Sequence, residues 1–480
     1  MIAVSTRWRR VGDLALGTGL VQAANVLTYI LLARLLTPVE YGSYRQLFLL
    51  NQVFWAVGFS ALPVALNYFG ASAAERSERA AVIRLHLRTT AIIAAVPALV
   101  LALGAAPIAG LLNNPALTHL LPLYAPYPAA YMFHSLVATV MIVQQRTKYV
   151  PVYMAAAALV TSVPVLIAAG WVGELRIVVM AASASAMLCA AGAIVVSLAL
   201  SRDPGATQVR LPNIMAYAVP LLAAAGIGTF ALKLDQFAVA RLLGTATFAV
   251  YAVGAFELPL YSLLKSASTT AIMPELTAAA QRKDWDAILG IWHDLLRKNA
   301  AMIFPVSAAL VTFAHEFVVV LFGERYAAAA PILALFSLLG PIRAVTFGLI
   351  LRAFGYTSAD LAGAVFFLVA VAIALGPAIG FFGVQGAAAT VVIATVLVAV
   401  LIVLLTVRIS GGRVRAWQLY PPRYLLIYAA LLGALTVLQI MMILAGLNEL
   451  GRLILAGLIA AAVSFLWLPE ARRRLWRVRA

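Results

Sequence analysis

The sequence contains one cysteine, Cys189, among 480 residues, and only 11% of its residues are charged. A single cysteine excludes an internal disulfide framework and a cysteine-ligated metal cluster. The chain also lacks the Gly-x-x-x-x-Gly-Lys loop that cradles ATP phosphates. The connections between its apolar runs are too short to hold a soluble catalytic domain. We therefore expect neither a cofactor nor an enzyme.

Acidic residues are half as frequent as basic ones, with 17 Asp and Glu against 34 Lys and Arg, which gives a net charge of +17. Such a balance can indicate a nucleic-acid-binding protein. Here, however, most basic residues lie in short loops between apolar runs. The sequence therefore predicts no nucleic-acid partner, and the excess of Lys and Arg on the side of both termini predicts that these are cytoplasmic.

Hydrophobic residues make up 64% of the chain. Runs of about 20 apolar residues, the length that crosses a bilayer as a helix, recur from end to end. We place fourteen of them. The sequence thus predicts an all-α integral membrane protein with about fourteen transmembrane helices.

A short segment occurs twice, as ARLLTPVEYGSY from Ala33 to Tyr44 and as ARLLGTATFAVY from Ala240 to Tyr251. Each copy ends one apolar run, makes a turn and begins the next. An even number of spans separates the copies, so the repeat is parallel. This pattern predicts two six-helix lobes, at residues 1–203 and 213–409, followed by two additional transmembrane helices at 423–470.

One segment between spans is amphipathic. From Gln281 to Lys298, apolar residues including Trp285 and Trp292 recur at helical spacing. Such a helix is typical of the membrane surface, and we expect it to lie flat there.

Three segments, ARLLTPVEYGSY, LDQFAVARLLGTATFAVYA and FGERYAAAAPILALFSL, carry a family resemblance. With the fourteen spans, they resemble the polysaccharide (Wzx-type, O-antigen) flippases of the multidrug/oligosaccharidyl-lipid/polysaccharide exporter superfamily. The resemblance implies two lobes around a central cavity and transport by alternating access in the bacterial inner (plasma) membrane. The implied substrate is a polyprenyl-diphosphate-linked oligosaccharide of lipopolysaccharide or exopolysaccharide synthesis, moved from the cytoplasmic to the outer leaflet. Membrane lipids, a glycan polymerase and glycosyltransferases are the implied partners.

Two other functions stay open at this point. A drug/cation antiporter of the same superfamily favours an acidic, aromatic cavity, whereas the charges deep in these spans are mainly basic. A membrane glycan polymerase or ligase, which is an enzyme, usually needs a large external loop.

Basic residues within spans are candidate substrate-binding residues, because a charge at the centre of a lone span costs about 2.5–3.5 kcal/mol and normally faces protein or water. Arg343 stands beside Pro341, which can open the helix, and its guanidinium can hold a diphosphate bidentately. The alternative is an Arg bonded to carbonyls of a neighbouring helix. Lys265 is either a headgroup contact or a snorkelling side chain, and Arg45 either lines a cavity or lies at the interface.

Lys233 and Glu257 stand at equal sequence distances from Thr245, the middle of a predicted turn, so they are expected at similar depth. They either form a structural ion pair, or Glu257 binds a proton or sodium ion and couples it to transport. Asp235 follows Lys233 by two residues and must face another side of the helix. It is a coupling carboxylate, a partner of Arg241 or a group that reaches water.

Further candidates are polar rather than basic. Tyr261 lies between Glu257 and Lys265 at helical spacing, which predicts one stripe of a continuous span. Amide side chains in the first two spans suit either sugar hydroxyls or interhelical hydrogen bonds; these are Gln22, Asn25, Asn51 and Gln52.

Overall fold

The computed structural model describes residues 2–356 and 358–467, with the backbone alone for 2–16. These residues form helices and no strands. The chain divides into two compact units, Met1–Ala249 and Val250–Ala480. The lobe boundaries given above stay a prediction, and residues 468–470 of the predicted C-terminal helix pair lie outside the described residues.

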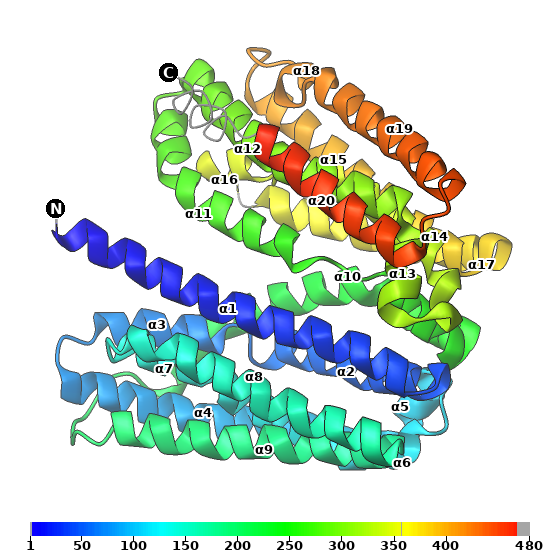
Figure 1. Ribbon diagram of the computed structural model, residues 1–480. Coiled ribbons are helices and arrows are strands. Elements are labelled where there is room, and N and C mark those ends of the chain that lie inside the picture. The colour runs from blue at the N-terminus through cyan, green and yellow to red at the C-terminus, as the bar shows by residue number, and fades with distance from the viewer. Residues whose placement is uncertain (1, 357, 468–480) are drawn as a thin grey trace. The chain divides into compact units, whose positions relative to one another are not determined.

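The N-terminal unit is a helical bundle in which α7 packs against α4 and α9, and α1 packs along α8 (Figure 1). Its helices are α1 (Ile2–Leu35), α2 (Pro38–Gly58), α3 (Leu62–Ser72), α4 (Arg76–Leu103), α5 (Ala105–Leu111), α6 (Leu117–Tyr124), α7 (Pro126–Val143), α8 (Val150–Ile167), α9 (Leu175–Leu200) and most of α10 (Leu211–Gly254).

The C-terminal unit is organised around α12, which packs against α11, α14, α15, α19 and α20. Its helices are α11 (Pro259–Gln281), α12 (Trp285–Thr312), α13 (Ala314–Phe322), α14 (Ala330–Ser337), α15 (Gly340–Arg343), α16 (Leu349–Ala353), α17 (Ser358–Ile409), α18 (Ala416–Leu419), α19 (Pro422–Leu444) and α20 (Glu449–Trp467).

The fourteen predicted spans all correspond to helical segments. Ten helices in the described residues are long and apolar enough to cross a membrane, or eleven if α12 and α13, bent by 79°, form one span. The 52-residue α17 bends at Gly383, where φ is 59°, and so contains two predicted spans. The remaining two are α11, which carries charged residues, and the broken segment α14–α16.

The two copies of the repeated segment make their turns differently. In the first copy Thr37 caps α2: its side chain accepts from the Glu40 amide, the Glu40 side chain accepts from the Thr37 amide, and Pro38 occupies the first turn. This is a capping box with proline at a favourable position. In the second copy, the bend falls at Gly244, with φ of 80°. The copies touch, because a Cβ on Gly42 would overlap the Thr245 carbonyl.

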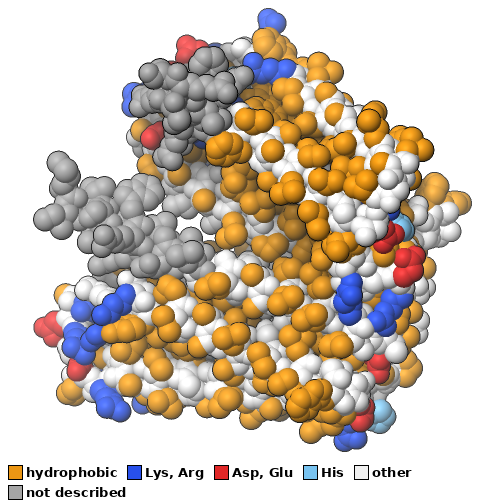
Figure 2. Space-filling view, in the orientation of Figure 1, with side chains coloured by type: hydrophobic (Ala, Val, Ile, Leu, Met, Phe, Trp, Pro, Cys, Tyr) orange, Lys and Arg blue, Asp and Glu red, His pale blue; other side chains and the backbone are white. Residues whose placement is uncertain are grey.

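The surface agrees with a membrane-embedded protein. Hydrophobic side chains cover the sides of the helices, and charged side chains gather mainly at helix ends (Figure 2). Large apolar residues such as Trp171 and Leu103 are more than four-fifths exposed. Exposed apolar surface on this scale is stable in lipid rather than in water.

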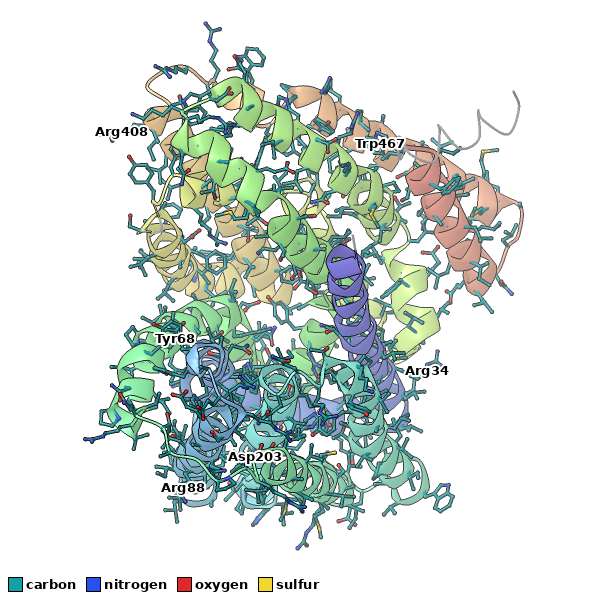
Figure 3. The ribbon with its side chains drawn as sticks, turned by 90° about the vertical axis from the view of Figure 1, so that its left-hand side faces the viewer. Arg34, Tyr68, Arg88, Asp203, Arg408 and Trp467 are labelled. Atoms are coloured by element: carbon teal, nitrogen blue, oxygen red, sulfur yellow. The ribbon has the colours of Figure 1, made fainter. Side chains whose placement is uncertain are left out.

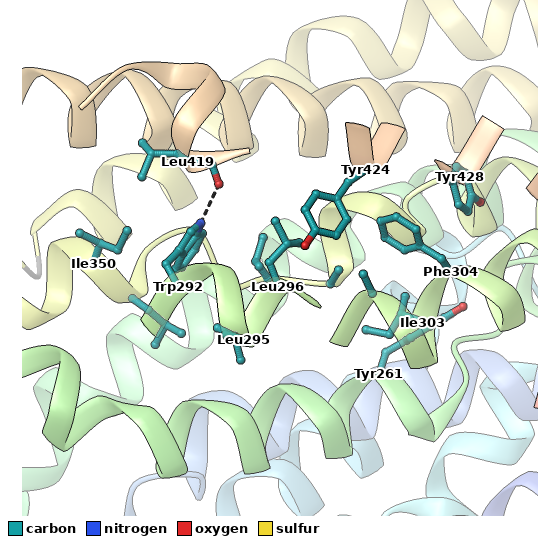
Figure 4. Close-up of a cluster of buried hydrophobic side chains, with 14 of the residues drawn as sticks. Tyr261, Trp292, Leu295, Leu296, Ile303, Phe304, Ile350, Leu419, Tyr424 and Tyr428 are labelled. Atoms are coloured by element: carbon teal, nitrogen blue, oxygen red, sulfur yellow. Dashed lines mark hydrogen bonds between the residues drawn. The ribbon is translucent and has the colours of Figure 1, made fainter. Parts of the chain in front are cut away.

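The amphipathic segment does not lie flat, so that prediction was wrong. From Trp285 onward it forms the first half of α12 and continues without interruption into the next span. Trp292 is buried against Ile350, and its indole N–H donates to the Leu419 carbonyl at 2.6 Å (Figure 4). Its apolar face is therefore covered by α16 and α18 instead of lipid headgroups.

The polar linker after α9 is attached to the N-terminal unit at its start. The Arg84 guanidinium donates to the carbonyls of Asp203 and Gly205, each at 3.0 Å. The Arg76 side chain pairs with the Asp203 carboxylate at 2.7 Å; Figure 3 labels Asp203 near the end of this bundle. The first residues of the linker are thus bound to α4 by hydrogen bonds and an ion pair.

Candidate functional site

The helix that carries Arg343 is broken. α14 ends at Ser337, α15 ends at Arg343, and residues 344–348 are not helical. Pro341 has no N–H, so the Ser337 carbonyl four residues earlier cannot form its helical hydrogen bond. The local opening of the helix that Pro341 predicts is therefore present.

Side chains from α12 replace part of the lost helical bonding. The Ser307 hydroxyl donates to the Ser337 carbonyl, and the Asn299 amide donates to the Ala344 carbonyl at 2.9 Å. A break in a membrane helix is tolerated where protein groups satisfy the released backbone in this way.

A second break precedes α11. Helix α10 ends at Gly254 and α11 begins at Pro259, so Glu257 stands in a non-helical segment. Leu258 has φ −64° and ψ 130°, because a residue before proline is driven out of the helical region. The expected continuous stripe through Glu257 was wrong, although Tyr261 and Lys265 do share α11.

Arg343 and Glu257 bring the two breaks together. Their side chains lie 3.7 Å apart, from Arg343 Nη2 to Glu257 Oε1. The guanidinium also lies 4.9 Å from the centroid of the buried Tyr261 ring. The Arg343 side chain is 22% exposed and that of Glu257 60% exposed. Since the carboxylate is largely open to its surroundings, another anion can compete with it for the guanidinium.

The other acidic and basic candidates are placed differently. Lys265 is exposed on α11. Asp235 is buried on α10. Lys233 and Glu257 belong to different units, and their predicted ion pair stays a prediction.

A cavity of about 310 Å³ lies within the N-terminal unit. Its wall combines amide, aromatic and basic side chains from α2, α7 and α10, namely Phe48, Asn51, Gln52, Trp55, Tyr131, Thr229, Leu232 and Lys233. Three predicted substrate-binding residues therefore meet here: Asn51, Gln52 and Lys233. A cavity with ring faces, amides and one ammonium group can bind sugar rings, hydroxyl groups and a negative substituent.

Arg45 adjoins this cavity through Phe48. Its guanidinium lies 4.5 Å from the Tyr29 ring centroid and 5.6 Å from that of Phe48, a cation–π arrangement. On α1, Gln22 is half-buried and Asn25 is exposed, and neither lines the cavity.

Aromatic cavity residues were not identified from the sequence. Trp55 follows Asn51 by four residues on α2, so helical spacing could have placed it on the same face. Tyr131 comes from α7, and its ring meets Trp55 edge-on at 5.1 Å. No local pattern indicates that contact, because it depends on how α7 packs against α2.

The backbone at Gly340 passes very close to α12. A Cβ at this position would overlap the Ser307 hydroxyl that binds the Ser337 carbonyl. We expect Gly340→Ala to lower stability by about 1–3 kcal/mol, the usual cost of overpacking. Thermal unfolding of the purified protein in detergent measures this. Gly433→Ala is the control, since nothing lies within 4 Å of a Cβ there; equal melting temperatures of the two variants would contradict the expectation.

These features define a multi-pass helical membrane protein with charged residues at helix breaks and polar residues in a cavity of the N-terminal unit. The family model described as "Polysaccharide biosynthesis protein" matches residues 31–331. The chain belongs to this family, which confirms the resemblance seen in the sequence. No sequence among the curated proteins matches the chain.

Solved structures share the fold over most of the chain. The lipid II flippase MurJ, in an inward closed conformation, has a TM-score of 0.68 at 13% identity, covering 96% of this chain and 98% of that one. An inward-facing multidrug resistance MATE transporter of the MOP superfamily has a TM-score of 0.65 at 13% identity, covering 84% and 98%. A Vibrio cholerae MATE transporter, VcmN, has a TM-score of 0.57 at 14% identity, covering 85% and 97%. The chain thus has the fold of MOP superfamily transporters.

Proposed function

We propose that this protein is a flippase that moves polyprenyl-diphosphate-linked oligosaccharides from the cytoplasmic to the outer leaflet of the bacterial inner membrane. Both termini are cytoplasmic in this proposal, and transport proceeds by alternating access. Membership of a polysaccharide biosynthesis family and a fold shared with a lipid II flippase support the substrate class.

The observation that carries the proposal is Arg343, which lies at one helix break and pairs with the exposed carboxylate of Glu257 from a second break. Broken helices are a common way to build a substrate site inside a membrane transporter. A guanidinium offers two parallel N–H donors, which match the oxygens of a diphosphate. The headgroup replaces Glu257 at Arg343 when the substrate binds.

The cavity in the N-terminal unit suits the sugar part of the substrate. Trp55 and Tyr131 offer ring faces, and Asn51 and Gln52 offer donors and acceptors for hydroxyl groups. Lys233 adds a positive charge to the same wall. This combination favours an oligosaccharide with an acidic substituent over a cationic drug.

In this proposal the membrane potential contributes energy to the movement of the anionic headgroup. Moving one negative charge outward gains about 2.3 kcal/mol per 100 mV. Glu257, once displaced from Arg343, can instead take up a proton or a sodium ion, which would couple headgroup binding to ion movement.

Deleting the gene in the source bacterium tests the proposal. We expect lipid-linked oligosaccharide to accumulate on the cytoplasmic leaflet, where an added impermeant glycosidase cannot reach it in intact spheroplasts. Accumulation on the outer leaflet would instead identify a polymerase or ligase. Normal glycan with increased sensitivity to cationic drugs would identify a drug antiporter, and would reject the flippase.

A further inference from the structure

Besides α12, a second segment contacts the break beside Arg343. It runs from α18 into α19, the first helix of the C-terminal pair. The Tyr420 hydroxyl donates to the Pro341 carbonyl at 2.9 Å. The Tyr428 hydroxyl lies 2.9 Å from Ser307 Oγ and 3.3 Å from the Ser337 carbonyl, so it joins the hydrogen bonds at that carbonyl. Both tyrosines therefore bind backbone that the helix break has released.

One of these carbonyls lies just before the short helix that presents Arg343, and the other lies inside it. Ser337 ends α14, and Pro341 lies within α15, two residues before Arg343. The Val345 amide, four residues beyond Pro341, donates to the Ile342 carbonyl at 3.5 Å, whereas the Pro341 carbonyl accepts from Tyr420. Without side-chain donors, both carbonyls would be unsatisfied in an apolar environment, which favours a different backbone path.

Tyr420 is itself held in place. The preceding residues of α18 are bound to α12: the Trp292 indole N–H donates to the Leu419 carbonyl, and the His293 ring lies 2.6 Å from the Gln418 carbonyl. Tyr428 is buried on α19 against Phe304 of α12 (Figure 4). The two tyrosines are thus fixed by contacts of their own segment with α12.

We propose that Tyr420 and Tyr428 are positioning residues that hold the broken segment so that Arg343 can bind the substrate headgroup. The segment from α18 to α19, which follows the twelve spans of the two predicted lobes, is then part of the headgroup site. This inference rests on the proposed function, because it takes Arg343 as the headgroup ligand.

The test compares Tyr420→Phe and Tyr428→Phe with Tyr424→Phe. Tyr424 lies between them on the same segment and is also buried, but its hydroxyl forms no hydrogen bond with the residues that the structure describes. Two quantities are measured on the purified full-length protein. One is amide hydrogen exchange in peptides covering residues 337–349, and the other is the affinity for undecaprenyl diphosphate in nanodiscs.

We expect the Tyr420 and Tyr428 variants to exchange faster in this segment and to bind undecaprenyl diphosphate about three- to tenfold more weakly, the usual scale of one hydrogen bond. The Tyr424 variant should change neither quantity. In an Arg343→Ala background, the tyrosine substitutions should still speed exchange but cause no further loss of affinity. A purely structural role would not produce this dependence on Arg343.

Unchanged exchange in both variants would overturn the inference, and so would an equal further loss of affinity in the Arg343→Ala background. The same experiment separates a failure of the proposed function. If Arg343→Ala alone binds undecaprenyl diphosphate as well as the unaltered protein, Arg343 is not the headgroup ligand, and a positioning role toward that ligand is rejected with it even when exchange is faster.

Discussion

Arg343→Glu should abolish surface glycan while the protein remains folded in the membrane. The substitution places a second carboxylate beside Glu257, whose oxygen now lies 3.7 Å from the guanidinium. The headgroup loses its bidentate donor and meets two negative charges instead. Hydrogen bonds to charged groups contribute about 1.5–3 kcal/mol, so losing this contact alone lowers affinity about 10- to 100-fold. Complementation of a deletion strain, scored by glycan staining and by protein level in membranes, measures the effect.

Two further variants serve as controls for this experiment. Arg408→Glu makes the same charge change at an exposed position at the end of α17 (Figure 3) and should leave glycan normal. Arg343→Lys keeps the charge but not the paired donors, and should restore only part of the activity. Full glycan from Arg343→Glu at normal protein levels would remove Arg343 from the mechanism.

Lys233→Met should weaken binding of the lipid-linked oligosaccharide about tenfold, provided that its glycan carries an acidic sugar. The substitution keeps the length of the side chain in the cavity wall but removes its charge, and a hydrogen bond to a charged group is worth about 1.5–3 kcal/mol. Binding is measured with the purified protein in nanodiscs, against undecaprenyl diphosphate without sugars. The loss should appear only with the glycosylated lipid.

Lys148→Met is the matched control for this prediction. Lys148 lies outside the cavity, in the short connection before α8, with its ammonium group 4.8 Å from the Tyr149 ring centroid. The Lys148→Met variant should bind the lipid-linked oligosaccharide and undecaprenyl diphosphate as well as the unaltered protein does. Equal losses for both lipids in Lys233→Met would place Lys233 at the headgroup, and no loss with an acidic glycan would exclude it from binding.

Parts of the site could be predicted from sequence where a residue is energetically costly inside a span, as a charge is, or breaks a helix, as proline does. Arg343 was identifiable because a charge within an apolar span needs a partner, and Pro341 predicted the break beside it. Asn51, Gln52 and Lys233 were identifiable as polar groups in apolar surroundings, and they do line one cavity. Pro259 was equally visible, yet its effect on Leu258 and Glu257 was underestimated, so the second break was missed.

Other parts of the site depend on contacts that no local pattern encodes. The pairing of Glu257 with Arg343 joins two segments more than eighty residues apart in sequence. The amphipathic start of α12 had the pattern of a helix on the membrane surface, but its apolar face packs against α16 and α18 instead of lipid. The sequence could not distinguish these outcomes, because both bury the same residues.

The sequence by itself determined the helical membrane fold, the positions of its apolar helical segments and the break beside Pro341. Hydrophobic length and the missing amide of proline are properties of the chain alone, and they act wherever the segment lies. The tertiary structure alone decided which side chains satisfy the released carbonyls and which carboxylate meets Arg343. Those choices depend on distances of a few ångströms between helices, and only packing sets such distances.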